Sequence, residues 1–588
     1  MKKSDSSRRN FMKMAGLGLV ASTLHATSGN VFAAKSREGA PTETPDRIAG
    51  KGYNVVLIVT DQERYFKKIP ESAELSSREK IKREGVSFNN HYNCSNMCTS
   101  SRSVIYTGQH IQHTGMFDNT NLPWQPDMST EIPTIGHMMR ELGYYTAYKG
   151  KVHLSEALTP EADKDDKLMT DAMEPYGFSD FNPTGDHYGK TLGGYTHDTG
   201  FAGDAVNWLR AKGAPLNEEG KPFFLAVNLI NPHDIMYFDT DPDGKDKQQT
   251  GKLLDPINRA PENTVYMKKH QDFPLPENLY QPITEKGRPR AHYEYHMGWD
   301  YMVGAIPDTD AHWTRYRDYY LNCLKDADMQ IGTVLDELER QGMRKNTVIV
   351  FTADHGEMGG NHNLRGKGPF SYEENIHVPM IIMHPEISGG KSTRAISSHL
   401  DLAPTLMNLT GAESAKIQKI TQTLPGKDMS PVLRNPTGAG IDSIRPGALH
   451  CFDMILTVDG DFIKKTVEAF DKGEDWVREK NIRPDLSKRG NIRIVFDGRY
   501  KFARYFAPLQ HNTPETWEEL KRLNDLELFD LRNDPHEMHN LAMTPEKNKS
   551  LIMRMNRLMN ELIKQEVGKD VGRELEDYHD WVVTDLRH

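Results

Sequence analysis

Five short stretches of this chain are almost continuously apolar, and they constrain its fold more than any other feature. They lie at residues 55–59, 144–148, 223–229, 348–351 and 378–383. Runs of this length without polar alternation are typical of parallel strands that are buried on both faces. Helical patterns separate several of them, for example at 132–142 and 319–341. The order predicts an α/β fold in which helices sandwich a large, mostly parallel sheet.

The 588 residues suffice for one large domain with a smaller companion. Segments 154–199 and 235–311 are polar and rich in Pro and Gly, so we predict loop insertions that carry substrate contacts. After residue 436 the apolar runs are shorter and alternate more, as at 492–495 and 501–505, and a helix is predicted over 545–564. We therefore predict a main domain over 50–435 and a C-terminal α+β subdomain over 436–588.

The first residues of the chain predict export. Residues 7–13 read Ser-Arg-Arg-Asn-Phe-Met-Lys, and a weakly apolar run rich in Ala and Gly follows and ends at 31–34. This pattern is typical of a twin-arginine signal peptide with a small-residue cleavage site. We expect residues 1–34 to form that signal, the Tat translocase to be a partner, and the mature protein to be periplasmic or secreted. The net charge of −10, with mixed signs, argues against nucleic-acid binding.

Polar side chains follow four of the five predicted strands. They are Asp61 and Gln62, Lys151 and His153, His233, and Asp354 and His355. Ligands of open α/β sheets bind beyond the carboxyl ends of the strands, so these groups are expected to form one site. Asp61 and Asp354 are candidate ligands of a hard divalent cation, and Gln62 and His355 are candidate additional ligands.

Cationic and proton-transferring groups accompany this predicted metal site. Lys151, His153, His233 and Lys367 would surround a tetrahedral anion with positive charge and with proton donors or acceptors. Lys367 lies in a Gly-rich loop shortly after Asp354.

Cys98 begins a stretch in which three small polar residues precede Arg102 and an apolar run ends at Thr107-Gly108. The pattern predicts a reactive side chain at a helix start, where N–H groups and a guanidinium favour an anion. The alternatives are an ordinary thiol or a disulfide with Cys94. A cysteine-phosphatase loop does not fit, because the Arg that it needs six positions after the Cys is Val104 here. A zinc site is disfavoured, since Cys94 and Cys98 are the only close pair.

Together these motifs resemble the sulfatase branch of the alkaline-phosphatase-like superfamily, in order over most of the chain. The resemblance rests on Asp61, residues 98–108, 143–153, Asn231-Pro232-His233, 354–359, Lys367 and the tail segment 527–535. The pairs Asp61-Gln62 and Asp354-His355 resemble those of choline-sulfatase and phosphonate monoester hydrolase-like members. Ser100 stands where the family usually carries Pro or Ala.

The resemblance implies the cofactors and the roles of the site residues. Cys98 would be oxidised to formylglycine by a formylglycine-generating enzyme or an anaerobic maturase, and Arg102 would orient the aldehyde hydrate that attacks sulfur. Asp61, Gln62, Asp354, His355 and residue 98 would bind one divalent metal ion, with Ca²⁺ expected first and Mg²⁺ or Mn²⁺ as alternatives. Lys151, His153, His233 and Lys367 would hold the sulfate and transfer protons, and Asn119 would add an amide to the sulfate pocket.

The sequence therefore predicts an exported sulfatase that hydrolyses an organic sulfate monoester, small-molecule or carbohydrate, to an alcohol and inorganic sulfate. Two alternatives stay open. One is a phosphonate monoester or phosphodiester hydrolase with the same site. The other is an anion-binding homologue in which Cys98 is not matured and no catalysis occurs.

Overall fold

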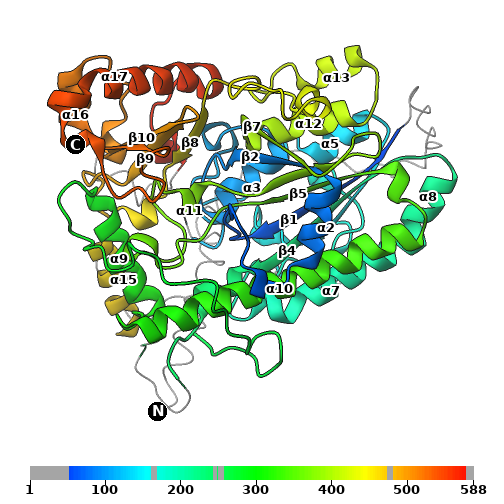
Figure 1. Ribbon diagram of the computed structural model, residues 1–588, viewed down its shortest axis with the longest axis horizontal. Coiled ribbons are helices and arrows are strands. Elements are labelled where there is room, and N and C mark those ends of the chain that lie inside the picture. Colours follow the sequence, from blue (N-terminus) through cyan, green and yellow to red (C-terminus); the bar gives the residue numbers. More distant parts are fainter. Residues whose placement is uncertain are drawn as a thin grey trace, which may run out of the picture.

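A seven-stranded sheet forms the centre of the molecule (Figure 1). The computed structural model describes residues 52–577 apart from residue 123 and segments 161–168, 243–247, 249–256 and 473–480, so the expected signal peptide lies outside the described residues. The strands are β1 (Asn54–Asp61), β2 (Val86–Tyr92), β3 (Tyr145–Gly150), β4 (Phe223–Pro232), β5 (Thr347–Ala353), β6 (Met380–Met383) and β7 (Lys391–Ser398). They lie in the order β3-β4-β1-β5-β6-β2-β7.

The sheet is mostly parallel, as predicted. Strands β3, β4, β1 and β5 are mutually parallel and confirm the first four apolar runs. The fifth run forms β6, but β6 is antiparallel to β5 and to β2, so the expectation of a parallel strand there is wrong. The physical reason is the connection: the chain between β5 and β6 stays at the edge where β5 ends, where Gly356 N–H donates to the Asn375 carbonyl, so the next strand runs back. The sequence pattern does not predict β2 or β7, because their side chains are largely polar.

Helices cover both faces of the sheet (Figure 1). On one face lie α2 (Ser76–Glu84), α7 (Gly193–Trp208) and α10 (Asp310–Arg340), and on the other lie α3 (Cys98–Thr107), α5 (Ile135–Glu141) and α12 (Leu402–Leu409). Alternate β1 side chains supply the two cores: Val56 packs with Ile331 of α10, whereas Leu57 packs with Ile105 of α3. The predicted α/β sandwich is therefore confirmed.

A second, smaller sheet follows in the C-terminal part. Its strands are β8 (Ala448–Phe452), β9 (Asn491–Phe496), β10 (Tyr500–Phe506) and β11 (Asp525–Asp530), antiparallel in the order β11-β10-β9-β8. The predicted C-terminal helix is α17 (Pro545–Leu562), and its Met555 packs in one core with Phe502 of β10. That core also includes Tyr92 of β2 and Ile396 of β7, so the two sheets share apolar contacts. The boundary at residue 436 stays a prediction.

The second predicted loop insertion also contains regular structure. Within 235–311, α9 (Arg290–Val303) packs against α15 (Gly460–Asp471). All four cysteines are buried and free, so Cys94 and Cys98 form no disulfide. Among the described residues, none of the helices combines the length and apolarity that a membrane span requires.

Candidate active site

The carboxyl ends of β3, β4, β1 and β5 bring the predicted polar groups together. Asp61 is the last residue of β1, and Lys151, His233 and Asp354 directly follow β3, β4 and β5. Cys98 is the first residue of α3 and lies among them, with its Sγ 3.2 Å from His355 Nε2. The topology therefore assembles one site from segments far apart in the sequence, as predicted.

Arg102 joins the two carboxylates at the centre of this site. Its Nη2 lies 3.1 Å from Asp61 Oδ2, and its Nε lies 3.0 Å from Asp354 Oδ2. All three side chains are fully buried. A buried guanidinium is stable there because both carboxylates compensate its charge. Its action on an oxidised residue 98 stays a prediction.

Four side chains form a candidate metal site. One potential ligand atom each of Asp61, Cys98, Asp354 and His355 lies within 4.8 Å of the others. Two carboxylates and an imidazole around a small buried space suit a divalent cation such as Ca²⁺, Mg²⁺ or Mn²⁺. The side-chain oxygen of Gln62 instead accepts a hydrogen bond from Lys367 Nζ at 2.6 Å, so its role as a ligand stays a prediction.

The two carboxylates differ in their pKa. Burial acts to raise the pKa of Asp61, but Lys151, His233 and Arg102 outweigh it and hold that pKa well below its usual value. For Asp354, burial and the charge of Asp61 together raise the pKa to about 7. A divalent cation between them would favour the ionised form of both.

The anion-facing side of the site carries lysines and imidazoles. Lys151 Nζ lies 2.6 Å from Asp61 Oδ2. Among the described residues, neither ring nitrogen of His153 nor Nδ1 of His233 has a hydrogen-bond partner, although these atoms are buried. Burial, reinforced by Lys151 and Lys367, lowers the pKa of both imidazoles well below its usual value. Unpaired polar atoms of this kind indicate a place for a ligand.

Comparison with known proteins agrees with this geometry. The sulfatase family model matches residues 53–412, which is more than half of the chain. This chain belongs to the sulfatase family. It is 25% identical over 462 residues to an N-acetylglucosamine-6-O-sulfatase of Bacteroides thetaiotaomicron (70% of this chain, 76% of that protein), and 24% identical over 525 residues to the choline-sulfatase of Rhizobium meliloti (84% and 83%).

A solved structure of similar fold is the phosphonate monoester hydrolase SpPMH of Silicibacter pomeroyi, with a TM-score of 0.60 and 22% identity. The match covers 89% of this chain and 96% of that chain. The family membership makes this sulfatase a sulfuric ester hydrolase by class.

A loop of the first insertion fixes both histidines of this sulfatase. The Asp186 carboxylate accepts the backbone N–H groups of Val152 at 3.0 Å and His153 at 2.6 Å. The Tyr188 ring stacks on the His153 ring with their centroids 4.5 Å apart. Gly189 lies so close to His233 that a Cβ there would be 2.9 Å from the ring. No sequence pattern identifies Asp186, because the insertion lacks periodicity.

Two further asparagines, Asn119 and Asn228, lie near the site. Asn119 Oδ1 accepts from the Thr99 N–H at 3.3 Å, next to the start of α3, and its contact with sulfate stays a prediction. Asn228 Oδ1 accepts from Arg102 Nη1 at 3.2 Å and from the Tyr106 hydroxyl at 2.7 Å. The sequence gives one indication that Asn228 is functional, because it is the only polar residue in the apolar run 223–229.

Proposed function

We propose that this sulfatase hydrolyses an organic sulfate monoester to an alcohol and inorganic sulfate, with formylglycine at position 98 and one divalent cation. The observation that carries the proposal is the buried cluster of Asp61, Cys98, Asp354 and His355, with their ligand atoms within 4.8 Å. Beside it lie Lys151, which is paired with Asp61, and two imidazoles with unpaired nitrogens. A metal site next to positive charge suits a tetrahedral anionic ester.

The two implied groups supply chemistry that unmodified side chains lack. The cation, for which we propose Ca²⁺ with Mg²⁺ and Mn²⁺ as alternatives, would act as a Lewis acid toward the ester oxygens. Formylglycine would supply a hydrated aldehyde oxygen as the nucleophile. The position of residue 98 at the N-terminus of α3 and beside His355 fits this role.

The remaining residues bind the ester and transfer protons. Lys151 and Lys367 place positive charge where the ester oxygens would lie, and Arg102 keeps the two carboxylates in position. We propose that Lys367 donates a proton to the departing alcohol, or that His233 does so when the negative charge of the bound ester raises its pKa. His153 would accept a proton, because its low pKa keeps the imidazole neutral and able to act as a base.

Mass spectrometry of the tryptic peptide that spans residue 98, taken from the natural host, tests the proposal. Formylglycine would lower the peptide mass by roughly 18 Da relative to cysteine, because an aldehyde group replaces the CH₂–SH group of the cysteine side chain. Parallel assays with an aryl sulfate and an aryl phosphonate monoester identify the ester. An unmodified thiol would contradict the mechanism, and a much higher kcat/KM for the phosphonate would favour phosphorus chemistry.

We further propose that the natural ester is a carbohydrate sulfate and that the enzyme is exported by the Tat translocase. The named activity of the N-acetylglucosamine-6-O-sulfatase relative supports the first point, and the Arg8-Arg9 pair before an Ala-rich run supports the second. Replacing both arginines, in Arg8→Lys/Arg9→Lys, should leave the protein in the cytoplasmic fraction of its host. Unchanged periplasmic recovery would argue against this route.

A further inference from the structure

A large groove lies over the part of the central sheet that α2 leaves uncovered, beyond the site described above. Its volume is about 1240 Å³, and its walls come from residues 63–69, α2, β2, β7 and the C-terminal unit. Small-molecule sites usually measure about 300–1,000 Å³. The groove is thus large enough for several linked units of a polymer.

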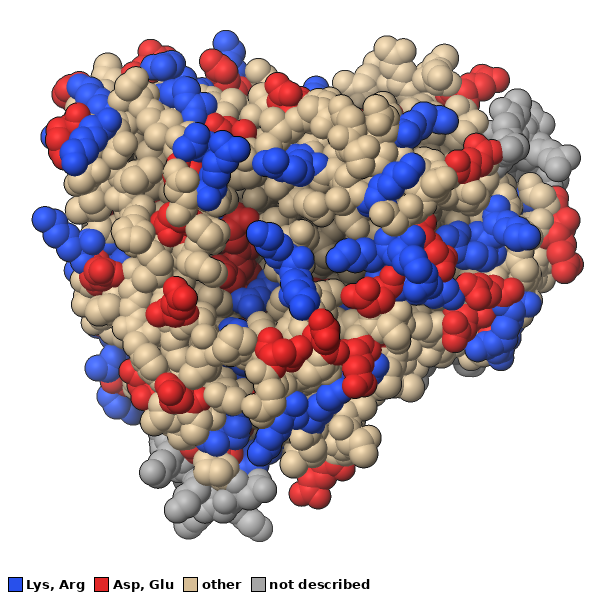
Figure 2. Space-filling model, in the orientation of Figure 1, with Lys and Arg blue, Asp and Glu red and all other residues tan. Residues whose placement is uncertain are grey.

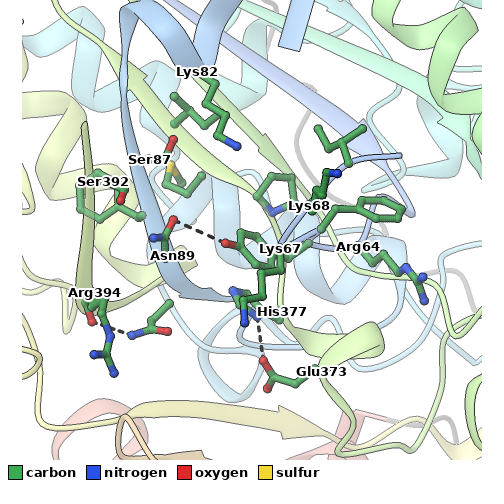
Figure 3. Close-up of a pocket in the computed structure, with 18 of the residues that line it drawn as sticks. Arg64, Lys67, Lys68, Lys82, Ser87, Asn89, Glu373, His377, Ser392 and Arg394 are labelled. Carbon is green, nitrogen blue, oxygen red and sulfur yellow. Dashed lines mark hydrogen bonds and ion pairs between the residues drawn. The ribbon is translucent and has the colours of Figure 1, made fainter. Parts of the chain in front are cut away.

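The polar floor of the groove follows from strand alternation. Val86 and Phe88 of β2 point into the core on the α3 side, so Ser87 and Asn89 point into the groove. In β7, Ala395 faces the same core, whereas Ser392 and Arg394 line the groove. Figure 3 shows Ser392 and Arg394 across from Arg64 and Lys68. The floor is therefore a sheet surface that offers hydroxyl, amide and guanidinium groups to a ligand.

Positive charge is concentrated around this groove although the chain as a whole is acidic. Ten Lys or Arg residues and four Glu residues line it, whereas the full sequence has 73 basic and 83 acidic residues. Two of the four acids, Glu63 and Glu373, are paired with Arg78 and Lys501. Four of the ten bases also have acidic partners, namely Lys68, Arg78, Arg83 and Arg499. Figure 2 shows Lys and Arg side chains beside the hollow near the middle of this face, together with Asp and Glu side chains.

Several of these basic side chains are available to a ligand. Lys67, Lys82, Lys391, Arg394 and Arg532 are exposed, and within the described part of the chain none of them has an acidic partner at ion-pair distance. Tyr65 adds a half-buried ring that is held against His377, with the ring centroids 4.0 Å apart. Unpaired cations beside a fixed aromatic ring match a chain that carries repeated anionic groups on rings with apolar C–H faces.

We propose that this groove binds a sulfated polysaccharide, holding one stretch of the chain while a sulfate ester of the same polymer is hydrolysed. This inference rests on the proposed function for the nature of the polymer. The wall of the groove begins at Glu63, directly after Asp61 and Gln62 of the active site. One continuous chain segment therefore contributes to both places. A small ester would leave most of the volume unused.

A charge-neutralised variant tests the groove. In a Cys98→Ala background, which prevents turnover, the triple variant Lys67→Ala/Lys82→Ala/Arg394→Ala should bind a fluorescent sulfated hexasaccharide about tenfold more weakly, with a smaller salt dependence. The control Lys345→Ala/Lys416→Ala/Lys419→Ala removes the same charge at exposed positions outside the groove and should bind like the parent. With Cys98 restored, the groove variant should hydrolyse an aryl sulfate at the parental kcat and KM.

The binding measurements test the groove independently of the proposed catalytic function. Equal weakening in both triple variants, unchanged affinity in the groove variant, or equal affinity for the desulfated hexasaccharide would overturn it. Preferential binding of duplex DNA that the groove variant loses would also overturn it, by assigning the groove to nucleic acid. Groove-dependent binding of the hexasaccharide by a protein without any sulfatase activity would uphold the groove and refute the proposed function.

Discussion

Arg102 determines the geometry of the site more than any other single residue. It spans Asp61 and Asp354, and it also donates to the Lys151 carbonyl at 3.0 Å. These contacts use the planar fork of the guanidinium, which a lysine ammonium cannot reproduce. We therefore expect the residue to serve both stability and catalysis, and a matched variant can separate these two effects.

Arg102→Lys should abolish measurable turnover of an aryl sulfate and lower the melting temperature, because the buried carboxylates lose part of their compensation. Arg78→Lys is the matched control: Arg78 is equally buried and pairs with Glu63 and Asp328, away from the metal cluster. It should lower the melting temperature to a similar extent while kcat stays within about twofold of the parent. Parallel loss of kcat in both variants would show that Arg102 acts only through stability.

Substitutions at positions 98 and 354 should differ in their effect on folding. Cys98→Ala should reduce kcat by at least about 10³-fold and change the melting temperature by only a few degrees, because its thiol makes few contacts. Asp354→Ala should also remove turnover, but it should destabilise the fold, since the carboxylate also accepts the N–H groups of Gln62 and His355 at 3.0 and 2.8 Å. Calorimetry with an activity assay measures both quantities. A melting temperature of Asp354→Ala equal to that of the parent would contradict this account.

At the scale of elements, loop 186–190 connects the first insertion to the candidate active site. Asp186 holds the backbone of His153, whose φ of 55° is in the left-handed region that favours glycine. Tyr188 and Gly189 lie against the two imidazoles. Because this loop touches both histidines, a change within it should alter catalysis without changing the metal cluster.

Asp186→Asn should lower kcat for an aryl sulfate by about 10- to 100-fold, because an amide cannot accept both N–H groups and His153 would shift. The metal affinity, measured by titration with Ca²⁺, should stay at the parental value. Asp180→Asn is the control in the same insertion, since Asp180 accepts from Tyr145 and Trp208 instead. A parental kcat in Asp186→Asn would refute the positioning role.

These elements also show what the sequence can and cannot predict. The strand ends that carry Asp61, Lys151, His233 and Asp354 were predictable, because a buried strand is a strong local signal and parallel topology places its end. Asp186 was not, since its importance depends on a loop whose path no periodicity specifies. The antiparallel direction of β6 depends on where the preceding connection lies in space, which the apolar run itself does not encode.

At the scale of the whole molecule, the smaller sheet supports the segment that leads into Cys98. The Cys451 N–H in β8 donates to the Cys94 carbonyl at 2.9 Å, and His450 Nδ1 lies 2.9 Å from Asn93 Oδ1. Residues 93 and 94 follow β2 and precede α3. The C-terminal unit therefore contributes to the position of Cys98 although none of the candidate site residues belongs to it.

The buried imidazole of His450 makes this junction sensitive to acid. Burial lowers its pKa to about 3, whereas a histidine in the unfolded chain titrates near 6.5. Between these values the unfolded state binds the additional proton, so the free energy of unfolding should fall as the pH decreases below about 6.5.

His450→Gln retains an amide that can bond to Asn93 and should give a shallower dependence of melting temperature on pH between about 6.5 and 4. His539→Gln, at an exposed side chain, should keep the parental slope. An unchanged slope in His450→Gln would place the acid sensitivity elsewhere, because only the loss of this imidazole separates that variant from the parent at the junction.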